Sequence, residues 1–287
     1  MICYNQDKKH YKVKSYKPFS KNTEFICYIN KYRDIKKLKN VKLGYSIIIK
    51  PNGYVPKTGI LLCRYLNQIP TLSSLKILDI GTGESALLAI HSAFLGSDEV
   101  TAIDIDKIAT KWAKKNVSIN KLDNKITVKK VSLYEYKSKS KFDIIISNPP
   151  QMPVKENISM HDDGGKDGKI HIEQIIKLAA KNLKKNGILI FSAFDFLGVD
   201  KRYNKESSIF DTLIKYSFYP KIVTIIGREI KPTSYTSKNL SYIKKKYYKY
   251  NFYKNKRGLY QYKIFIIHSV KTNHKINLKT WKKTQQK

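Results

Sequence analysis

Cysteine is scarce in this chain of 287 residues, which contains only Cys3, Cys27 and Cys63. Three cysteines leave at least one thiol unpaired, and no two of them have the close spacing of a metal or redox motif. The sequence therefore argues against a disulfide-stabilised secreted domain, and a reducing cytoplasm is the expected compartment.

Long apolar runs are also missing. No stretch approaches the roughly 18 consecutive apolar residues of a membrane-spanning helix, and the polar residues 1–9 lack the apolar core of a signal peptide. Secretion and membrane insertion are therefore not expected.

Acidic residues are few: 22 Asp and Glu stand against 56 Lys and Arg, which gives a net charge of +34. A field of this size around a compact fold would attract RNA, ribosomes or acidic proteins. The alternative is that the lysines only solvate the surface of a chain encoded by a genome rich in A and T. Composition alone leaves both interpretations open.

The length suits one catalytic α/β domain with a small appendage, because domains cluster at about 100–200 residues. Residues 1–42 are basic and without a clean period, so we expect an N-terminal accessory region there. Residues 43–270 are expected to form the main domain, and residues 271–287 a basic tail. An insertion rich in Lys and Tyr interrupts the main domain at about residues 229–257.

Short apolar runs alternate with helical spacings from residue 45 onward. The pattern predicts strands at residues 45–49, 76–80, 100–103, 125–131, 142–147, 188–191, 221–226 and 260–268. It predicts helices at residues 59–66, 85–94, 108–120, 170–183 and 207–217. The alternation is typical of an α/β fold, a Rossmann-like seven-stranded sheet flanked by helices.

Two interpretations of the insertion remain open. Tyrosines interleaved with cations suit contacts with phosphates and stacked bases. Alternatively, the segment is a long hairpin whose tyrosines pack onto the sheet.

A glycine-rich turn, Asp79-Ile80-Gly81-Thr82-Gly83, follows the strand at residues 76–80 and opens a helix. Glycines there let the backbone approach a ligand at the carboxyl end of the sheet. Ala86 occupies the place of the third glycine of a dinucleotide-binding turn, so a nucleoside is the expected ligand. Asp104 ends the next strand, where an acidic side chain accepts hydrogen bonds from ribose hydroxyls. Asp79 either anchors the loop or meets an amino group of the ligand.

A second turn, Asn148-Pro149-Pro150-Gln151, directly follows the apolar run 142–147. It places the Asn148 side-chain oxygen and the Pro149 carbonyl where they can accept both protons of a planar NH2 group. The lone pair of such a nitrogen is delocalised, and pulling on both N–H bonds stabilises the positive charge that develops during attack. The alternative is a turn that only ends a strand.

The glycine turn, the acidic strand end and the Asn-Pro-Pro turn together resemble class I methyltransferases that use S-adenosylmethionine, over about residues 43–269. The downstream segment Gly164-Gly165-Lys166-Asp167-Gly168, with its following helix and the strand entered through Asn186-Gly187, is similar to that of the protein-glutamine methyltransferases that modify translation release factors. Residues 54–58 also resemble that family's segment before the donor site, where Thr58 would begin a helix covering the cofactor.

The resemblance implies a class I methyltransferase sheet, S-adenosyl-L-methionine as cofactor and no metal. The acceptor would be held by Asn148, Pro149, Pro150 and Gln151. The cofactor would be bound by Thr58, Asp79, Gly81, Gly83, Asp104, Ile105, Ser132, Leu133 and Asn148. His161, His171 and His268 show no ligand spacing. Trp112 and Ala113 are expected to be core residues, and His91 is expected to be a satisfied core or surface residue and not a base.

The chain departs from this family in three places. Gln151 replaces an aromatic residue, so a flipped base would lack its stacking partner. Val131-Ser132-Leu133 stands where an acidic residue often meets adenine, although Ser132 could still form one hydrogen bond. Residues 1–42 lack the helical period expected of the family's N-terminal substrate-recognition domain.

The sequence therefore predicts an S-adenosylmethionine-dependent N-methyltransferase that acts on a planar amide or amino nitrogen, with a protein glutamine as one acceptor. An RNA or DNA base amine methyltransferase is the first alternative, favoured by the charge. A small-molecule methyltransferase of a biosynthetic pathway, favoured by Gln151, is the second, and a non-enzymatic RNA-binding or partner-binding module is the third. Contact with nucleic acid or the ribosome is the expected use of the basic surface, and no membrane partner is expected.

Overall fold

The computed structural model describes residues 2–5, 14–15, 24–29, 35–51, 53, 55–155, 162–274 and 276. Tyr54, His161 and residues 277–287 of the predicted tail lie outside the described residues. The chain divides into two compact units, Met1–Ser132 and Leu133–Lys287, and each is described by itself. In the described part of the chain, no helix has the length and apolar character needed to cross a membrane.

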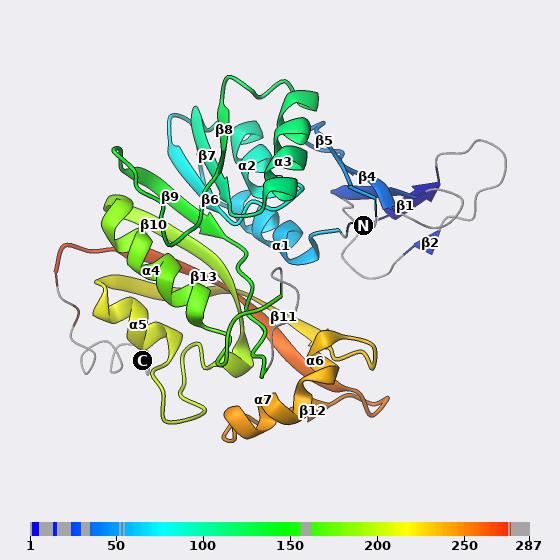
Figure 1. Ribbon diagram of the computed structural model, residues 1–287, viewed down its shortest axis with the longest axis vertical. Helices are drawn as coiled ribbons and strands as arrows, with labels where there is room; N and C mark the ends of the chain where they lie inside the picture. Colours follow the sequence, from blue (N-terminus) through cyan, green and yellow to red (C-terminus); the bar gives the residue numbers. More distant parts are fainter. Residues whose placement is uncertain are drawn as a thin grey trace. The chain divides into compact units, whose positions relative to one another are not determined.

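The first unit begins with a five-stranded sheet, drawn in blue in Figure 1. Its strands are β1 (Ile2–Asn5), β2 (Lys14–Ser15), β3 (Phe25–Ile29), β4 (Ile35–Asn40) and β5 (Ser46–Ile48), paired in the order β2-β1-β3-β4-β5. Only β1 and β3 are parallel. The strand predicted at residues 45–49 is confirmed as β5. The other four strands, of two to six residues each, were not predicted, because they are short and lie in a basic stretch without a clean period.

The rest of the first unit alternates helices and parallel strands. Its elements are α1 (Lys57–Leu66), β6 (Lys76–Ile80), α2 (Leu87–Phe94), β7 (Glu99–Asp104), α3 (Lys107–Ile119) and β8 (Ile126–Lys130). Strand β7 pairs in parallel with β6 on one side and β8 on the other. Each predicted boundary is confirmed to within two residues. Ala113 of α3 is buried as expected, whereas Trp112 is half-buried beneath the Lys115 ammonium.

Two asparagines of α3 close the free edge of β5. The Asn116 Oδ1 atom accepts the Ile48 N–H at 2.8 Å, and its Nδ2 donates to the Ile48 carbonyl at 3.1 Å. Asn120 repeats this with Ser46, at 3.0 and 2.7 Å. The match arises because residues four apart share one helix face and residues two apart share one side of a strand. Side-chain amides thus take the place of a neighbouring strand at this edge.

His91 of α2 is a satisfied core residue, the first of the two expected alternatives. Its Nδ1 lies 2.8 Å from the Tyr45 hydroxyl and its Nε2 lies 3.0 Å from Asn67 Oδ1. Burial lowers the His91 pKa to about 4, so the ring is neutral near pH 7. Asn67 also donates to the buried carboxylate of Glu24, which joins the N-terminal sheet to α1 and α2.

The second unit carries the remaining strands and helices (Figure 1). They are β9 (Phe142–Ser147), α4 (Ile170–Asn182), β10 (Leu183–Phe194), a 3-10 turn (Asp195–Leu197), α5 (Ile209–Lys215), β11 (Phe218–Glu229), α6 (Tyr235–Lys238), α7 (Leu240–Lys246), β12 (Tyr253–Lys254) and β13 (Tyr260–Lys271). The strand order is β11-β13-β10-β9, with β9 and β10 parallel and β13 antiparallel to both of its neighbours.

Several boundaries in this unit differ from the prediction: β10 ends at Phe194 and not at Phe191, β11 is three residues longer at each end, and β13 is three residues longer at its end. Strand β10 begins at Leu183, not at Ile188, and its register with β9 shifts between these residues, where Asn186 adopts a positive φ of 59°. The insertion lies between β11 and β13 but is not a plain hairpin, because α6 and α7 fold within it. Tyr247 is fully buried, as the packing interpretation expects. Tyr235, Tyr248 and Tyr253 are exposed, as ligand contact would require.

We expect Asn116→Ala to lower the free energy of unfolding by about 2–3 kcal/mol, because the Ile48 N–H and carbonyl would lose their partners at a half-buried edge. Urea unfolding monitored by circular dichroism measures the change. Asn124→Ala removes an exposed asparagine of the same unit and should stay within about 0.5 kcal/mol. Equal losses in the two variants would show that the Asn116 bridge contributes nothing.

Candidate functional site

The glycine turn after β6 has the open backbone that a ligand needs. Gly81 and Gly83 adopt φ values of +71° and +61°, which favour glycine, and a Cβ built at either residue meets no heavy atom within 4 Å. The Gly81 and Thr82 N–H groups donate to the Ile103 carbonyl at 2.9 and 3.0 Å, which fixes the turn to the end of β7. A fixed turn with open space beside its glycines fits close approach of a nucleoside.

Ala86 ends this turn at the start of α2. It adopts a left-handed conformation, with φ 47° and ψ 31°, that glycine adopts more readily. The chain therefore keeps the backbone geometry of a third glycine while carrying a methyl group, which is fully buried.

Asp104 holds the turn from the neighbouring strand. Its Oδ2 accepts the Gly83 N–H at 2.8 Å and its Oδ1 accepts the Asp106 N–H at 3.0 Å. Its carbonyl accepts the Val131 N–H at 2.9 Å, which joins the end of β8 to the same place. Carboxylate oxygens carry further lone pairs, so Asp104 can also accept ribose hydroxyls.

Ile105 and Ser132 flank Asp104 and the end of β8. The Ile105 side chain is 53% exposed and offers apolar surface beside the carboxylate, whereas Ser132 is almost buried. Residues at the carboxyl ends of β6, β7 and β8 are thus brought together within the first unit, as the sequence predicts.

Asp79 anchors the loop. It is fully buried, and its Oδ2 accepts the Thr82 hydroxyl at 2.6 Å. Burial raises the Asp79 pKa to about 7, although the hydrogen bond from Thr82 works in the opposite direction. This geometry supports the anchoring interpretation over direct contact with an amino group.

Thr58 is the second residue of α1, so a helix does begin where the sequence predicts one. The adjacent Gly59 is close to α2, since a Cβ built there lies 3.2 Å from Leu87 Cδ2. The start of α1 thus packs against the start of the helix that follows the glycine turn. Thr58 itself is partly exposed at this place.

The Asn-Pro-Pro-Gln turn follows the last residue of β9. Asn148 and Pro150 are half-buried, whereas Pro149 and Gln151 are buried. The Gln151 side chain points inward to β10, where its Oε1 accepts the Phe194 N–H at 2.6 Å. It does not take the place of the aromatic side chain that the related family has at this position. The Gln151 side chain is therefore not available to stack on an acceptor.

A directed chain of hydrogen bonds runs from this contact to Asn148. A backbone N–H can only donate, so the Gln151 atom that faces the Phe194 N–H must be the oxygen Oε1. The other end of the Gln151 amide, Nε2, is therefore a donor. Nε2 lies 3.3 Å from the Ser192 hydroxyl oxygen, 3.3 Å from the Ser192 carbonyl and 3.4 Å from the Pro149 carbonyl. The Ser192 hydroxyl then donates to Asn148 Oδ1 at 2.8 Å. The Asn148 amide is thereby held in one orientation, with its oxygen as acceptor.

The glycine-rich loop at residues 164–168 supports this turn from the other side. The Met152 N–H donates to the Asp162 carbonyl, and the Gly164 N–H donates to the Met152 carbonyl, both at 2.9 Å. A Cβ on Gly164 would lie 2.6 Å from the Gln151 Cα, and one on Gly168 would lie 2.7 Å from the Gln151 carbonyl oxygen. Only glycine permits this approach, which explains the glycines of the Gly-Gly-Lys-Asp-Gly segment.

The predicted site residues fall into two groups. Thr58, Asp79, Gly81, Gly83, Asp104, Ile105 and Ser132 lie in the first unit, and Leu133, Asn148, Pro149, Pro150 and Gln151 lie in the second. Both turns lie at the carboxyl end of a parallel strand, where open α/β sheets bind ligands. Within the described ranges, no group of three or more His, Cys, Asp or Glu side chains could hold a metal ion.

Sequence reasoning missed Ser192 and Phe194. The strand was predicted to end at Phe191, one residue before the serine, because Ser192 breaks the apolar run. A buried hydroxyl at the carboxyl end of an apolar strand was the signal that could have identified it.

Residues 56–162 match the family model of the ribosomal protein L11 methyltransferase (PrmA). A candidate protein N5-glutamine methyltransferase of Methanocaldococcus jannaschii is 29% identical over 56% of this chain and 82% of its own length. A release factor glutamine methyltransferase of Flavobacterium psychrophilum is 30% identical over 53% of this chain, which spans 61% of that relative.

A solved structure shows the same fold. A candidate methyltransferase of Bacillus halodurans superposes with a TM-score of 0.50 at 15% identity, covering 74% of this chain and 99% of its own. The comparisons confirm the Rossmann-like class I fold and the resemblance to the glutamine methyltransferases. The comparisons identify the chain as a methyltransferase.

The raised pKa of Asp79 predicts a pH effect on stability. Between pH 4 and pH 7 the unfolded chain loses this proton while the folded chain keeps it, so the folded state becomes less stable as pH rises. The change from the ordinary value of 3.8 to about 7 corresponds to roughly 4 kcal/mol at most. We therefore expect Asp79→Asn to gain stability relative to the native protein across this range.

Urea unfolding at pH 4, 5.5 and 7 measures the difference between the two proteins. Asp98→Asn, which removes an exposed carboxylate of the same unit, controls for the change in net charge. A difference for Asp79→Asn that stays constant from pH 4 to pH 7 would contradict the raised pKa.

Proposed function

We propose that this enzyme transfers the methyl group of S-adenosylmethionine to a planar carboxamide nitrogen, the side-chain amide of a protein glutamine. The cofactor supplies a methyl group on a sulfonium, which an aligned nitrogen can displace in line. The protein has to bind the cofactor, align the amide and stabilise the charge that grows on its nitrogen.

The observation that carries the proposal is the fixed orientation of the Asn148 amide. The Ser192 hydroxyl uses one lone pair of Asn148 Oδ1, at 2.8 Å, and a second lone pair remains for an incoming N–H. The Pro149 carbonyl, which has only a long contact of 3.4 Å to Gln151, is the second acceptor. Two fixed acceptors at one strand end suit the two protons of an NH2 group.

An amide fits this turn better than a nucleic-acid base. A flipped base is held by stacking between flat or apolar side chains, and Gln151 replaces the aromatic residue while directing its side chain to β10. The glutamine methyltransferases named in the comparisons add support for an amide acceptor. A small-molecule amide presents the same NH2 group, so only the labelled product separates it from a protein.

The cofactor roles follow from the geometry of the first unit. We assign the turn at Gly81 and Gly83 to close contact with the cofactor, Asp104 to its ribose hydroxyls and Ile105 to its purine. Thr58 and Ser132 flank these residues, and Leu133 follows in sequence. Asp79 is assigned to the support of the turn, because both its burial and its bond to Thr82 serve the loop.

The acceptor protein is proposed to belong to the translation machinery. The relatives are named for release factors and for ribosomal protein L11, and the net charge of +34 suits partners rich in RNA. We also propose that residues 1–42 act as an accessory region and that the enzyme works in the cytoplasm.

We expect Asn148→Ala to bind S-adenosylmethionine as the native protein does but to lose at least about 100-fold in turnover, because one of the two acceptors is removed. Calorimetry measures cofactor binding. Incubation of a cell extract with donor carrying a labelled methyl group, followed by peptide mass spectrometry, measures turnover and identifies the methylated atom.

Label on a glutamine side chain in the native reaction, and its loss with Asn148→Ala, is the expected result. Label on RNA or in the small-molecule fraction would overturn the proposed acceptor. Unchanged turnover of Asn148→Ala would overturn its role. Asn124→Ala, an exposed asparagine remote in sequence from both turns, serves as the matched control.

A further inference from the structure

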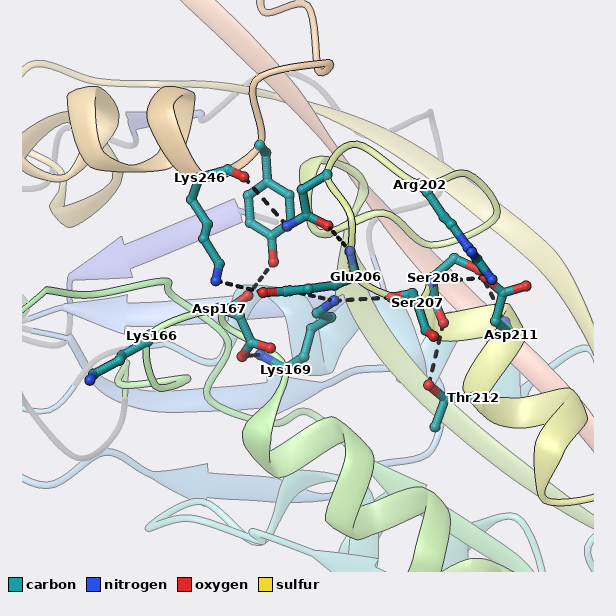
Figure 2. Close-up of polar contacts among 12 residues, drawn as sticks. Lys166, Asp167, Lys169, Arg202, Glu206, Ser207, Ser208, Asp211, Thr212 and Lys246 are labelled. Atoms are coloured by element: carbon teal, nitrogen blue, oxygen red, sulfur yellow. Dashed lines mark hydrogen bonds and ion pairs between the residues drawn. The ribbon is translucent and has the colours of Figure 1, made fainter.

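The segment at residues 231–257, here called the insertion arm, is held firmly to the second unit. The Tyr247 ring is fully buried and its hydroxyl donates to the Asp167 carbonyl, while the Tyr242 hydroxyl donates to the Lys166 carbonyl at 2.7 Å. Figure 2 shows Lys166 and Asp167 beside the end of the arm. The arm is thus bonded to the glycine-rich loop that supports the acceptor turn.

A chain of ion pairs fixes the same end of the arm (Figure 2). The Lys246 ammonium lies 2.6 Å from one Glu206 oxygen, and the buried Lys169 ammonium lies 3.1 Å from the other. Burial works to raise the Glu206 pKa, but the hydrogen bonds from Lys246 and Lys169 lower it on balance. Glu206 therefore stays ionised and ties α7 to the start of α4.

Aromatic packing secures the rest of the inner face. The Tyr250 hydroxyl donates to Asp195 Oδ2 at 2.8 Å, and the Phe252 ring lies 5.8 Å from the ring of the fully buried Phe196. These contacts account for the inward tyrosines of the insertion. The face that remains outside is fixed in place and not a mobile loop.

Every exposed charged residue on the outer face of the arm is basic. The arm contains no Asp or Glu. Its exposed charged residues are Lys231, Lys238, Lys245, Lys249, Lys254, Lys256 and Arg257. Arg257 pairs with Glu229, which precedes the arm. The whole chain has 56 basic and 22 acidic residues, whereas the arm has basic residues alone. The excess of positive charge in the arm is therefore greater than the lysine-rich composition of the whole chain explains.

Exposed tyrosines lie among these cations. Tyr235, Tyr248 and Tyr253 are 44%, 56% and 61% exposed. The Lys238 ammonium lies 5.4 Å from the centre of the Tyr235 ring, and Lys249 lies 5.8 Å from that of Tyr248. Flat rings next to ammonium groups are the surface that single-stranded nucleic acids use, since bases stack on the rings and phosphates meet the cations.

We propose that the outer face of the insertion arm binds single-stranded RNA. An acidic protein would use the lysines but would leave the three exposed rings without partners, and a duplex would hide the bases that stack on them. The arm rests on the loop at residues 164–168, whose Gly164 and Gly168 contact Gln151. This inference rests on the proposed function: the outer face binds the RNA of a ribonucleoprotein, and the turn at residues 148–151 receives a glutamine of the same ribonucleoprotein.

Fluorescence anisotropy with a labelled 12-nucleotide RNA tests the binding, using the full chain in 50–300 mM KCl. We expect the triple variant Lys245→Gln, Lys249→Gln, Lys254→Gln to weaken binding at least tenfold at 100 mM KCl. The salt slope should fall by about 2, at about 0.7 for each lost phosphate contact. The matched control is Lys111→Gln, Lys114→Gln, Lys129→Gln, three exposed lysines of the first unit, which should change binding less than threefold.

Stacking is tested separately with Tyr248→Leu, Tyr253→Leu, which keeps the charge. This variant should bind at least fivefold more weakly, and Tyr248→Phe, Tyr253→Phe should restore binding. Equal losses in the two lysine triples, no effect of the leucine variant, or equal affinity for poly-glutamate would overturn the proposal. Cofactor binding by calorimetry is the independent readout: its absence in the native protein would overturn the proposed function and leave the RNA result standing.

Discussion

The hydrogen bond from the Phe194 backbone N–H to the Gln151 side chain sets the orientation of the side-chain amides in the turn at residues 148–151. An amide side chain could otherwise be rotated by half a turn, but a backbone N–H can only donate, so the Gln151 oxygen must face it. The order then passes through Ser192 to Asn148, whose oxygen is fixed as an acceptor before any substrate arrives. A preorganised acceptor avoids the cost of reorienting a dipole during the reaction.

This chain depends on close backbone packing that only glycine allows. Gly164 and Gly168 bring the loop at residues 164–168 against the Gln151 backbone, and the insertion arm is bonded to that loop through Tyr242 and Tyr247. Glycine has a different role in the first unit, where Gly81 and Gly83 adopt positive φ values and leave open space in a turn that Asp104 holds. In both units glycine sets the geometry, and a polar side chain from a neighbouring strand holds it.

Most of the catalytic fold could be predicted from sequence, because its strands are largely buried and have mostly apolar sequences, as in β6 and β9. The N-terminal sheet could not, since its strands are short and β4, with the sequence Ile-Lys-Lys-Leu-Lys-Asn, has no regular alternation of apolar and polar residues. The two turns were found from their residue types. The Ser192 link was missed because it joins residues 44 apart in sequence, and no local pattern records such a pairing.

The most direct test of this account is a double-mutant cycle on turnover with Ser192→Ala and Gln151→Leu, at saturating S-adenosylmethionine. If both residues act by fixing the orientation of the Asn148 amide, each single variant should lose about tenfold in kcat. The double variant should lose little more, because either substitution alone already releases the Asn148 amide. Losses that multiply to about a hundredfold, with cofactor affinity unchanged, would contradict a single directed chain.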